Sequence, residues 1–427
     1  MGNRRLIQTF LFCFFFTTLS GVLRKWVFTS STVGNAIFGV QLLLPFLFFF
    51  TSRRAFGRLF LNTALPLYLL VLLAEAFNPL NLTIYHGLLG ILVHSYFWLF
   101  IFLYLQNREY LVIDTWIWPM LLICFSEVVL GMVQYQQPAT SFINRYANLE
   151  AVGGNIANVG KSVRVTGTFS YIGGYGALLI AVPFLVGYIF KKGYSANLVL
   201  GLMGAGLVGC FMSGSRGVTY LYVGEMALVI LSEWRSFRKI QLTALFIPVV
   251  ILALFFTLYG NFGEIGNKVA TAFNNFNDRR ETLAQSGEES RRIEGDIPRI
   301  LHFEGKYPLF GVGLGATYQG ATQLFGTSPY VEEFGYVEGE LIRVILEGGF
   351  LLFFVRFFMA WYLVSQLAVP TLLKLLVFGL VFYAVVWVFN IYNAFYLAFG
   401  IIVIDQAYYR PANLRQPPHT TLPTAQT

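Results

Sequence analysis

Residues 290–315 read SRRIEGDIPRILHFEGKYPLFGVGLG, and residues 336–349 read YVEGELIRVILEGG before an apolar run begins at Phe350. This is the densest polar stretch of a chain that is otherwise close to continuous hydrocarbon, and it ends where a membrane helix is expected to begin. Arginines, carboxylates and a histidine beside a bilayer need partners, because an unpaired charge is costly there. We therefore expect this stretch to carry the function of the protein.

The composition places the chain in a bilayer. Of its 427 residues, 56% are hydrophobic and only 12% are charged, whereas about 25% of the residues of a soluble domain are charged. Cys13, Cys124 and Cys210 lie in apolar runs without metal-ligand spacing, so neither disulfides nor a zinc site are expected. The net charge of +8 comes mainly from short loops between apolar runs, which indicates membrane topology rather than nucleic-acid binding.

Runs of about 20 apolar residues predict membrane-spanning helices. We expect an all-α integral membrane protein of roughly 11–12 transmembrane helices, with a large external loop that contains amphipathic helices. The expected spans are 6–23, 35–50, 59–77, 84–105, 112–134, 170–190, 196–212, 217–232, 240–259, 341–363, 372–389 and 391–408. The chain then divides into transmembrane helices (1–259), a large periplasmic loop (260–340), C-terminal transmembrane helices (341–409) and a disordered cytoplasmic tail (410–427).

The lysines and arginines of the short loops predict the orientation, with the N-terminus in the cytoplasm. The cytoplasmic loops then hold Arg53, Arg54, Arg58, Arg108, Lys191, Lys192, Arg235, Arg238, Lys239 and Lys374. Other cations lie outside, against the usual bias, and these include Arg24, Lys25, Arg145, Arg164, Arg216, Arg291 and Arg292. Cations in such places indicate an anionic partner; acidic lipid headgroups, or ion pairs with carboxylates of the loop, are the alternative.

Polar motifs lie at the expected external ends of two spans. VRVTGTFSYIGGYG (163–176) places Arg164 and Thr168 at the entrance of the sixth span. SGSRGV (213–218) is a short turn that holds Arg216, with Glu225 of the same helix as one possible partner. An anionic ligand is the other partner considered for Arg216.

The opening stretch supplies candidate acids and bases. Its glycine-rich turn, PLFGVGLG at 308–315, lacks the Lys-Ser/Thr of a P-loop, and no Asp-x-Asp motif is exposed, so nucleotide-sugar binding is not expected. Arg343 and Glu347 stand four apart on one helix face and are expected to pair. Glu338 and Glu340 are expected nearer the water, where a carboxylate can act as a general base. His302 is a further candidate base, or a histidine that packs beside Phe303.

Taken in order, these motifs resemble the O-antigen polymerase / O-antigen ligase superfamily. The resemblance rests on LRKW (23–26), VRVTGTFS (163–170), SGSRG (213–217), RRIE (291–294), YPLFGVGLG (307–315) and E-x-E-x-x-R-x-x-x-E-x-G (338–349). It covers the chain from about residue 20 to residue 365, and the order of the motifs is more specific than any one of them.

The resemblance implies an enzyme on the external face of the bacterial inner membrane that acts on sugars carried by undecaprenyl pyrophosphate. It implies that Arg216 and Arg292 hold the pyrophosphate, with Arg291 as the close competitor of Arg292 and Arg164 as a third contact. Ligases of this superfamily carry a His-Asn pair where this chain has Glu338 and Gly339, a departure that favours a polymerase. Glu338 is then the candidate base, with Glu340 and His302 as substitutes.

The function expected from the sequence is metal-independent, inverting polymerisation of lipid-linked oligosaccharide repeats into a surface or exopolysaccharide, without a cofactor. The partners are then the lipid-linked donor and acceptor, the bilayer and other polysaccharide-assembly proteins, but no nucleic acid. A ligase that moves finished glycan to a lipid or protein stays an alternative, as do a lipid-linked oligosaccharide flippase or other transporter and an inert scaffold. A transporter is expected to show internal repeats, and no convincing repeat is seen in the sequence.

Overall fold

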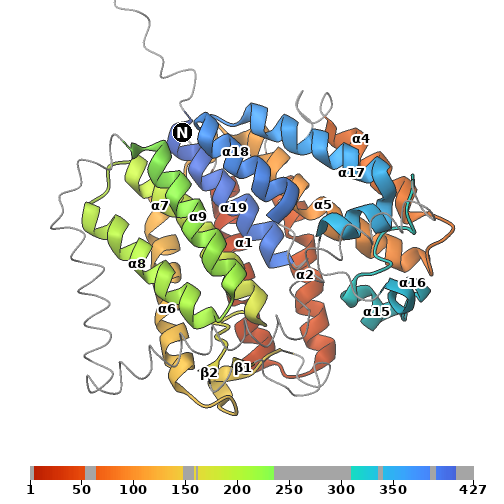
Figure 1. Cartoon of the computed structure of the whole chain (residues 1–427), viewed down its shortest axis with the longest axis horizontal. Coiled ribbons are helices and arrows are strands. Elements are labelled where there is room, and N and C mark those ends of the chain that lie inside the picture. The colour runs from red at the N-terminus through yellow and green to blue at the C-terminus, as the bar shows by residue number, and fades with distance from the viewer. Residues whose placement is uncertain are drawn as a thin grey trace, which may run out of the picture.

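The computed structural model describes residues 4–52, 64–147, 158–159, 162–234, 309–334, 340–384 and 391–409. Within these residues the chain is a bundle of helices (Figure 1), and seven of the helices are long and apolar enough to cross a membrane. They are α1 (Arg4–Val22, continued by the π-helix η1, Leu23–Val27), α2 (Ser31–Thr51), α5 (Ile84–Asn107), α6 (Ile117–Gln136), α7 (Ile172–Lys191), α8 (Ala196–Ser213) and α19 (Ile391–Tyr408). The predicted helical membrane fold is confirmed.

Shorter or more polar helices complete the described bundle. They are α4 (Ala64–Ala76), α9 (Arg216–Ser232), α17 (Glu340–Gln366), α18 (Thr371–Gly379) and the π-helix η4 (Leu380–Ala384). The loops hold η2 (Asp114–Trp116), η3 (Phe142–Asn144), α15 (Gln319–Phe325), α16 (Pro329–Phe334) and the two-residue strands β1 (Asn158–Val159) and β2 (Ser162–Val163). These strands pair antiparallel, with Asn158 opposite Val163. The predicted span 240–259, the amphipathic helices expected in 260–308 and the tail 410–427 lie outside the described residues.

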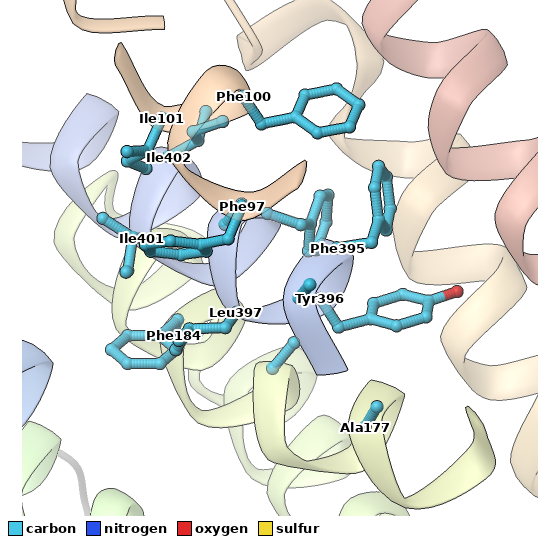
Figure 2. Packing of buried hydrophobic residues seen from close by; sticks show 14 of the residues in the cluster. Phe97, Phe100, Ile101, Ala177, Phe184, Phe395, Tyr396, Leu397, Ile401 and Ile402 are labelled. Carbon is cyan, nitrogen blue, oxygen red and sulfur yellow. The ribbon is translucent and has the colours of Figure 1, made fainter. Parts of the chain in front are cut away.

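Helix α19 forms the centre of the bundle, where it packs along α7 and against α5. Figure 2 shows Phe97 and Phe100 of α5 and Phe184 of α7 around the aromatic and aliphatic side chains of α19. The rings of Phe100 and Phe395 meet edge to face with centroids 5.5 Å apart. Gly400 lets α7 come close, because a Cβ atom there would lie 2.6 Å from the ring of Phe184. Small residues at such crossings are how membrane helices pack.

The bundle has two polar ends, which we name by one arginine each. The Arg108 end holds Arg108, Asp114, Lys191, Lys192, Glu233 and Asp405. The Arg24 end lies at the other end of α7 and α19, where Ser170 contacts Arg24 and Tyr392. It holds Arg24, Lys25, Arg145, Arg164 and Arg216. The structure thus places Arg108, Lys191 and Lys192, which are predicted to be cytoplasmic, at the opposite end from five cations predicted to be external.

Candidate functional site

The centre of the Arg24 end is the segment Val165–Ser170, which leads into α7 and is held by side chains of α6. The Oε1 atom of Gln134 accepts hydrogen bonds from the backbone N–H groups of Thr166 (3.1 Å) and Gly167 (2.8 Å), and its Nε2 donates to the carbonyl of Gly167 (2.9 Å). The carboxylate of Glu127 accepts from the N–H of Thr168 (2.9 Å). These bonds satisfy backbone groups that a loop inside a membrane protein must otherwise leave unpaired.

The LRKW motif docks onto the same segment from α1. A Cβ atom on Gly21 would collide with the carbonyl oxygen of Thr168, so glycine is what lets α1 approach this backbone. The helix then widens into the π-helix Leu23–Val27, a rare geometry that is frequent at functional sites. Lys25 donates to Thr166 Oγ1 and to the carbonyl of Gly167, both at 2.8 Å, and Arg24 donates to Ser170 Oγ at 3.2 Å.

Arg164 and the Arg216 turn also meet at this end, as the sequence predicts. The Nε atom of Arg164 donates to the carbonyl of Ser213 (3.2 Å), and the N–H of Val165 donates to the carbonyl of Met212. Gly214 ends α8 with a left-handed φ of 61°, and α9 begins at Arg216. Both arginines are half-buried. Segments from α1, from the loop before α7 and from the α8–α9 turn therefore bring four cations to one end.

The charges of Arg24 and Lys25 have no carboxylate partner at hydrogen-bond distance. Their hydrogen bonds go to Ser170, Thr166 and Gly167, and neither side chain forms an ion pair within the described residues. Glu127 acts on Lys25 only through the longer-range field. A cation that is desolvated without a counter-charge is costly, and an anionic ligand removes that cost.

A second cluster of charges lies inside the bundle, on α17. Glu340 forms ion pairs with Arg343, one turn further along, and with Arg356, from beyond a kink at Gly349. Gly349 has a left-handed φ of 60°, which turns the two limbs of α17 so that Arg356 reaches back to the start of the helix. Glu340 is only 2% exposed, so the prediction that it faces water is wrong: two arginines close over it.

Glu347 completes this cluster and explains the glycine-rich turn. Its carboxylate accepts from the backbone N–H groups of Gly315 (2.9 Å) and Thr317 (3.0 Å), from Thr317 Oγ1 (2.8 Å), and lies 3.1 Å from His94 Nε2 of α5. The ion pair that Arg343 forms among the described residues is with Glu340, and Arg343 acts on Glu347 through the longer-range field rather than through the close contact expected. The backbone donors of the turn thus bind a carboxylate of the protein itself.

The glycines of this turn are required by close backbone contacts. Gly311 and Gly315 both have left-handed φ values, 63° and 75°. A Cβ atom on Gly311 would meet the backbone of Leu346 and Glu347, and one on Gly315 would meet the carbonyl of His86. The turn is thereby wedged between α5 and the first limb of α17, which fixes the N–H groups that hold Glu347.

Tyr318 lies close to the cluster on α17. The guanidinium of Arg343 is 6.0 Å from the centre of its ring. Burial raises the pKa of Tyr318 to about 12, and the positive charges of Arg343 and Arg24 oppose that rise. Tyr318 therefore lies beside the α17 cluster, and the field of Arg24 also reaches its phenol.

Several predicted residues are not tested by this arrangement. Glu338, His302, Arg291 and Arg292 lie outside the described residues, so their roles stay predictions. Glu225, considered as a partner of Arg216, is buried and makes no hydrogen bond to any described residue. No group of three or more histidines, cysteines or carboxylates in the described part of the chain could hold a metal ion.

Sequence reasoning missed His94, Glu127, Gln134 and Arg356 as contributors to these clusters. Each lies in the middle or near the end of an apolar helix, where a polar side chain needs a partner inside the protein. That signal was available in the sequence for each residue alone. Which residues pair with which was not, because His94 and Glu347 are far apart in the chain.

Comparison with family models, with curated proteins and with solved structures finds no match to this chain.

Proposed function

We propose that this protein is a membrane glycosyltransferase that polymerises undecaprenyl-pyrophosphate-linked oligosaccharide repeats into a surface or exopolysaccharide. The observation that carries the proposal is the convergence of Arg24, Lys25, Arg164 and Arg216 at one end of the bundle. These cations belong to the LRKW, VRVTGTFS and SGSRG motifs, through which the chain resembles the O-antigen polymerase / O-antigen ligase superfamily. The end that they occupy is proposed to face the periplasm across the inner membrane.

The proposed reaction needs a diphosphate clamp. Arg164 and Arg216 hold the pyrophosphate of the donor lipid, and Arg292 or Arg291 adds a further contact. Arginine binds phosphate oxygens in a bidentate manner, and its charge stabilises the leaving group as the bond to the sugar breaks. The half-buried setting of Arg164 and Arg216 strengthens that attraction, because water screens it less.

The proposed base is Glu338, which removes the proton of the acceptor hydroxyl. The hydroxyl oxygen attacks the anomeric carbon, the bond from that carbon to the pyrophosphate oxygen breaks, and the configuration inverts. Glu340 is reassigned from a substitute base to a positioning residue, because two arginines occupy its carboxylate. It fixes the start of α17, two residues after Glu338 in the sequence. His302 remains a second candidate base.

Reconstitution of the purified chain with a lipid-linked repeat tests this proposal. Formation of a new glycosidic bond supports the polymerase, whereas movement of the intact lipid across the bilayer without bond formation indicates a transporter. An acceptor that retains its polyprenyl carrier indicates a polymerase, and transfer to a lipid core or a protein indicates a ligase. Arg216→Ala and Arg292→Ala are each expected to abolish long-chain product while the protein stays in the membrane. Product of normal length in both variants would remove these residues from the site.

A further inference from the structure

We propose that Arg24, together with the rings of Phe38 and Tyr171, binds an acidic sugar, a pyranose that carries a carboxylate. This inference rests on the proposed function, since it assigns a class of substrate to the same end of the bundle. It names a residue and a ligand chemistry beyond the diphosphate clamp of Arg164 and Arg216.

The guanidinium of Arg24 does not use all of its N–H donors in hydrogen bonds to described residues. One nitrogen donates to Ser170 at 3.2 Å. The Nε–H is buried and finds no acceptor among the described residues. A guanidinium carries five N–H donors in a planar fork that matches a carboxylate. A buried N–H without an acceptor costs free energy, so a ligand carboxylate would both satisfy the donor and neutralise the charge.

The π-helix explains why Arg24 faces inward next to another inward-facing cation. In Leu23–Val27 the N–H of Phe28 donates to the carbonyl of Leu23, five residues back. The wider turn lets the consecutive side chains of Arg24 and Lys25 both contact the segment Val165–Ser170. A regular α-helix separates neighbours by about 100° and turns one of them toward lipid.

One aromatic ring lies at the guanidinium, and further rings lie next to its partner Ser170. Tyr171 directly follows Ser170, the hydrogen-bond partner of Arg24, and keeps part of its surface exposed. The ring of Phe38 lies 6.0 Å from the guanidinium carbon, and Tyr171 packs against Tyr392 with ring centroids 5.8 Å apart. Aromatic walls with a few placed polar groups are typical of sites for small organic ligands. A pyranose ring offers an apolar face to such rings, which a bare phosphate does not.

Arg24 and the proposed diphosphate clamp of Arg164 and Arg216 contact different parts of the structure. Arg164 contacts the α8–α9 turn through Ser213. Lys25 contacts Thr166 and Gly167, near the start of the segment Val165–Ser170. Arg24 contacts Ser170, at the far end of the same segment, where Ser170 also contacts Tyr392 of α19. A repeat unit whose diphosphate lies at Arg164 and Arg216 would therefore extend its sugars toward Arg24.

Ligand binding to the purified full-length chain in lipid nanodiscs tests the inference, with D-glucuronate, D-glucose and inorganic pyrophosphate as probes. Line broadening of the ligand signals in ¹H and ³¹P NMR suits weak binding. We expect glucuronate to bind more tightly than glucose. Arg24→Gln should weaken glucuronate by about tenfold or more, the size expected for loss of a charged hydrogen bond. Arg24→Lys should lie in between, because lysine keeps the charge without the fork.

The controls make each result decisive. Arg145→Gln, an exposed cation at the same end, should leave glucuronate binding unchanged. Pyrophosphate binding should survive Arg24→Gln, which also shows that the variant is folded. Equal binding of glucuronate and glucose, or glucuronate binding that Arg24→Gln leaves unchanged, overturns the inference while leaving the polymerase proposal intact. Loss of pyrophosphate binding alone in Arg24→Gln assigns Arg24 to the clamp and also overturns it. Failure of the wild-type chain to bind pyrophosphate while glucuronate binds counts against the proposed function instead.

Discussion

At one polar end of the bundle the described cations form ion pairs, whereas at the other end Arg24 and Lys25 form none within the described residues. At the Arg108 end, Arg108 pairs with Asp405, Lys191 with Glu233 at 2.8 Å, and Lys192 with Asp114 at 3.1 Å. At the Arg24 end, Arg24 and Lys25 contact hydroxyls and a carbonyl and form no ion pair within the described residues. Balanced charges lock helices together, whereas unbalanced ones attract a ligand. Under the proposed function, the Arg108 end then serves stability and the Arg24 end serves binding.

The Arg108 end shows how a stabilising network is built. Asp405 of α19 is fully buried and accepts hydrogen bonds from Arg108, Tyr104 and the backbone N–H of Ala368. Arg108 also donates to the carbonyl of Gln366 at 3.1 Å. The ends of α5, α17 and α19 are thereby joined through one carboxylate, although the Nε–H of Arg108, like that of Arg24, finds no acceptor among the described residues.

The largest expected effect is loss of this network. Arg108→Ala leaves the buried carboxylate of Asp405 without its counter-charge, so the free energy of unfolding should fall by about 3–5 kcal/mol, the range measured when one partner of a buried ion pair is removed. Thermal unfolding of the purified chain in detergent measures the change. Arg145→Ala, which removes an exposed cation at the other end, is the matched control. A similar loss in both variants would mean that the two ends do not differ in this respect.

A smaller effect on stability is expected at Lys25. Lys25→Met removes a buried cation that has no ion-pair partner within the described residues, so the desolvation cost disappears together with two hydrogen bonds. The free energy of unfolding should change by no more than about 1 kcal/mol. Product formation should fall sharply, because the segment Val165–Ser170 loses a contact. A drop in stability as large as that of Arg108→Ala would show that Lys25 is structural.

The smallest effect is expected at the surface of the Arg108 end. The side chain of Lys191 is 37% exposed, and its pair with Glu233 is screened by water. Lys191→Gln should lower the free energy of unfolding by less than about 1 kcal/mol, as for other exposed ion pairs. Added salt should reduce the difference from the wild-type chain further. A loss of several kcal/mol would show that the pair is more deeply buried in the membrane than its exposure indicates.

The sequence predicts the helices far better than their contacts. Hydrophobic length alone places α5, α7, α8 and α19 within a few residues, because a bilayer fixes how long an apolar helix must be. It also predicts which cations share an end, since loops alternate between the two sides. Length and hydropathy carry no information on which helices are neighbours, and so the central place of α19 could not be predicted.

In the candidate site, too, the sequence predicts the positions of residues along the chain better than their contacts. Arg164 and Arg216 were found from motifs at helix ends, and their segments do meet. The sequence places Glu340 just before an apolar span and so nearer the water, whereas the kink at Gly349 brings Arg356 over it. Gly348 and Gly349, followed by an apolar run, are compatible with a straight helix and with a kinked one. Only the long-range packing of the turn against α17 decides between them.

The most direct test of an anion-binding Arg24 end is the equilibrium affinity of the purified chain for inorganic pyrophosphate. Arg164→Gln combined with Arg216→Gln should weaken binding by about tenfold or more, as expected when charged hydrogen bonds to phosphate are lost. Lys191→Gln combined with Lys192→Gln, an equal loss of charge at the Arg108 end, should leave the affinity unchanged. Equal weakening in both double variants, or in neither, would contradict the account.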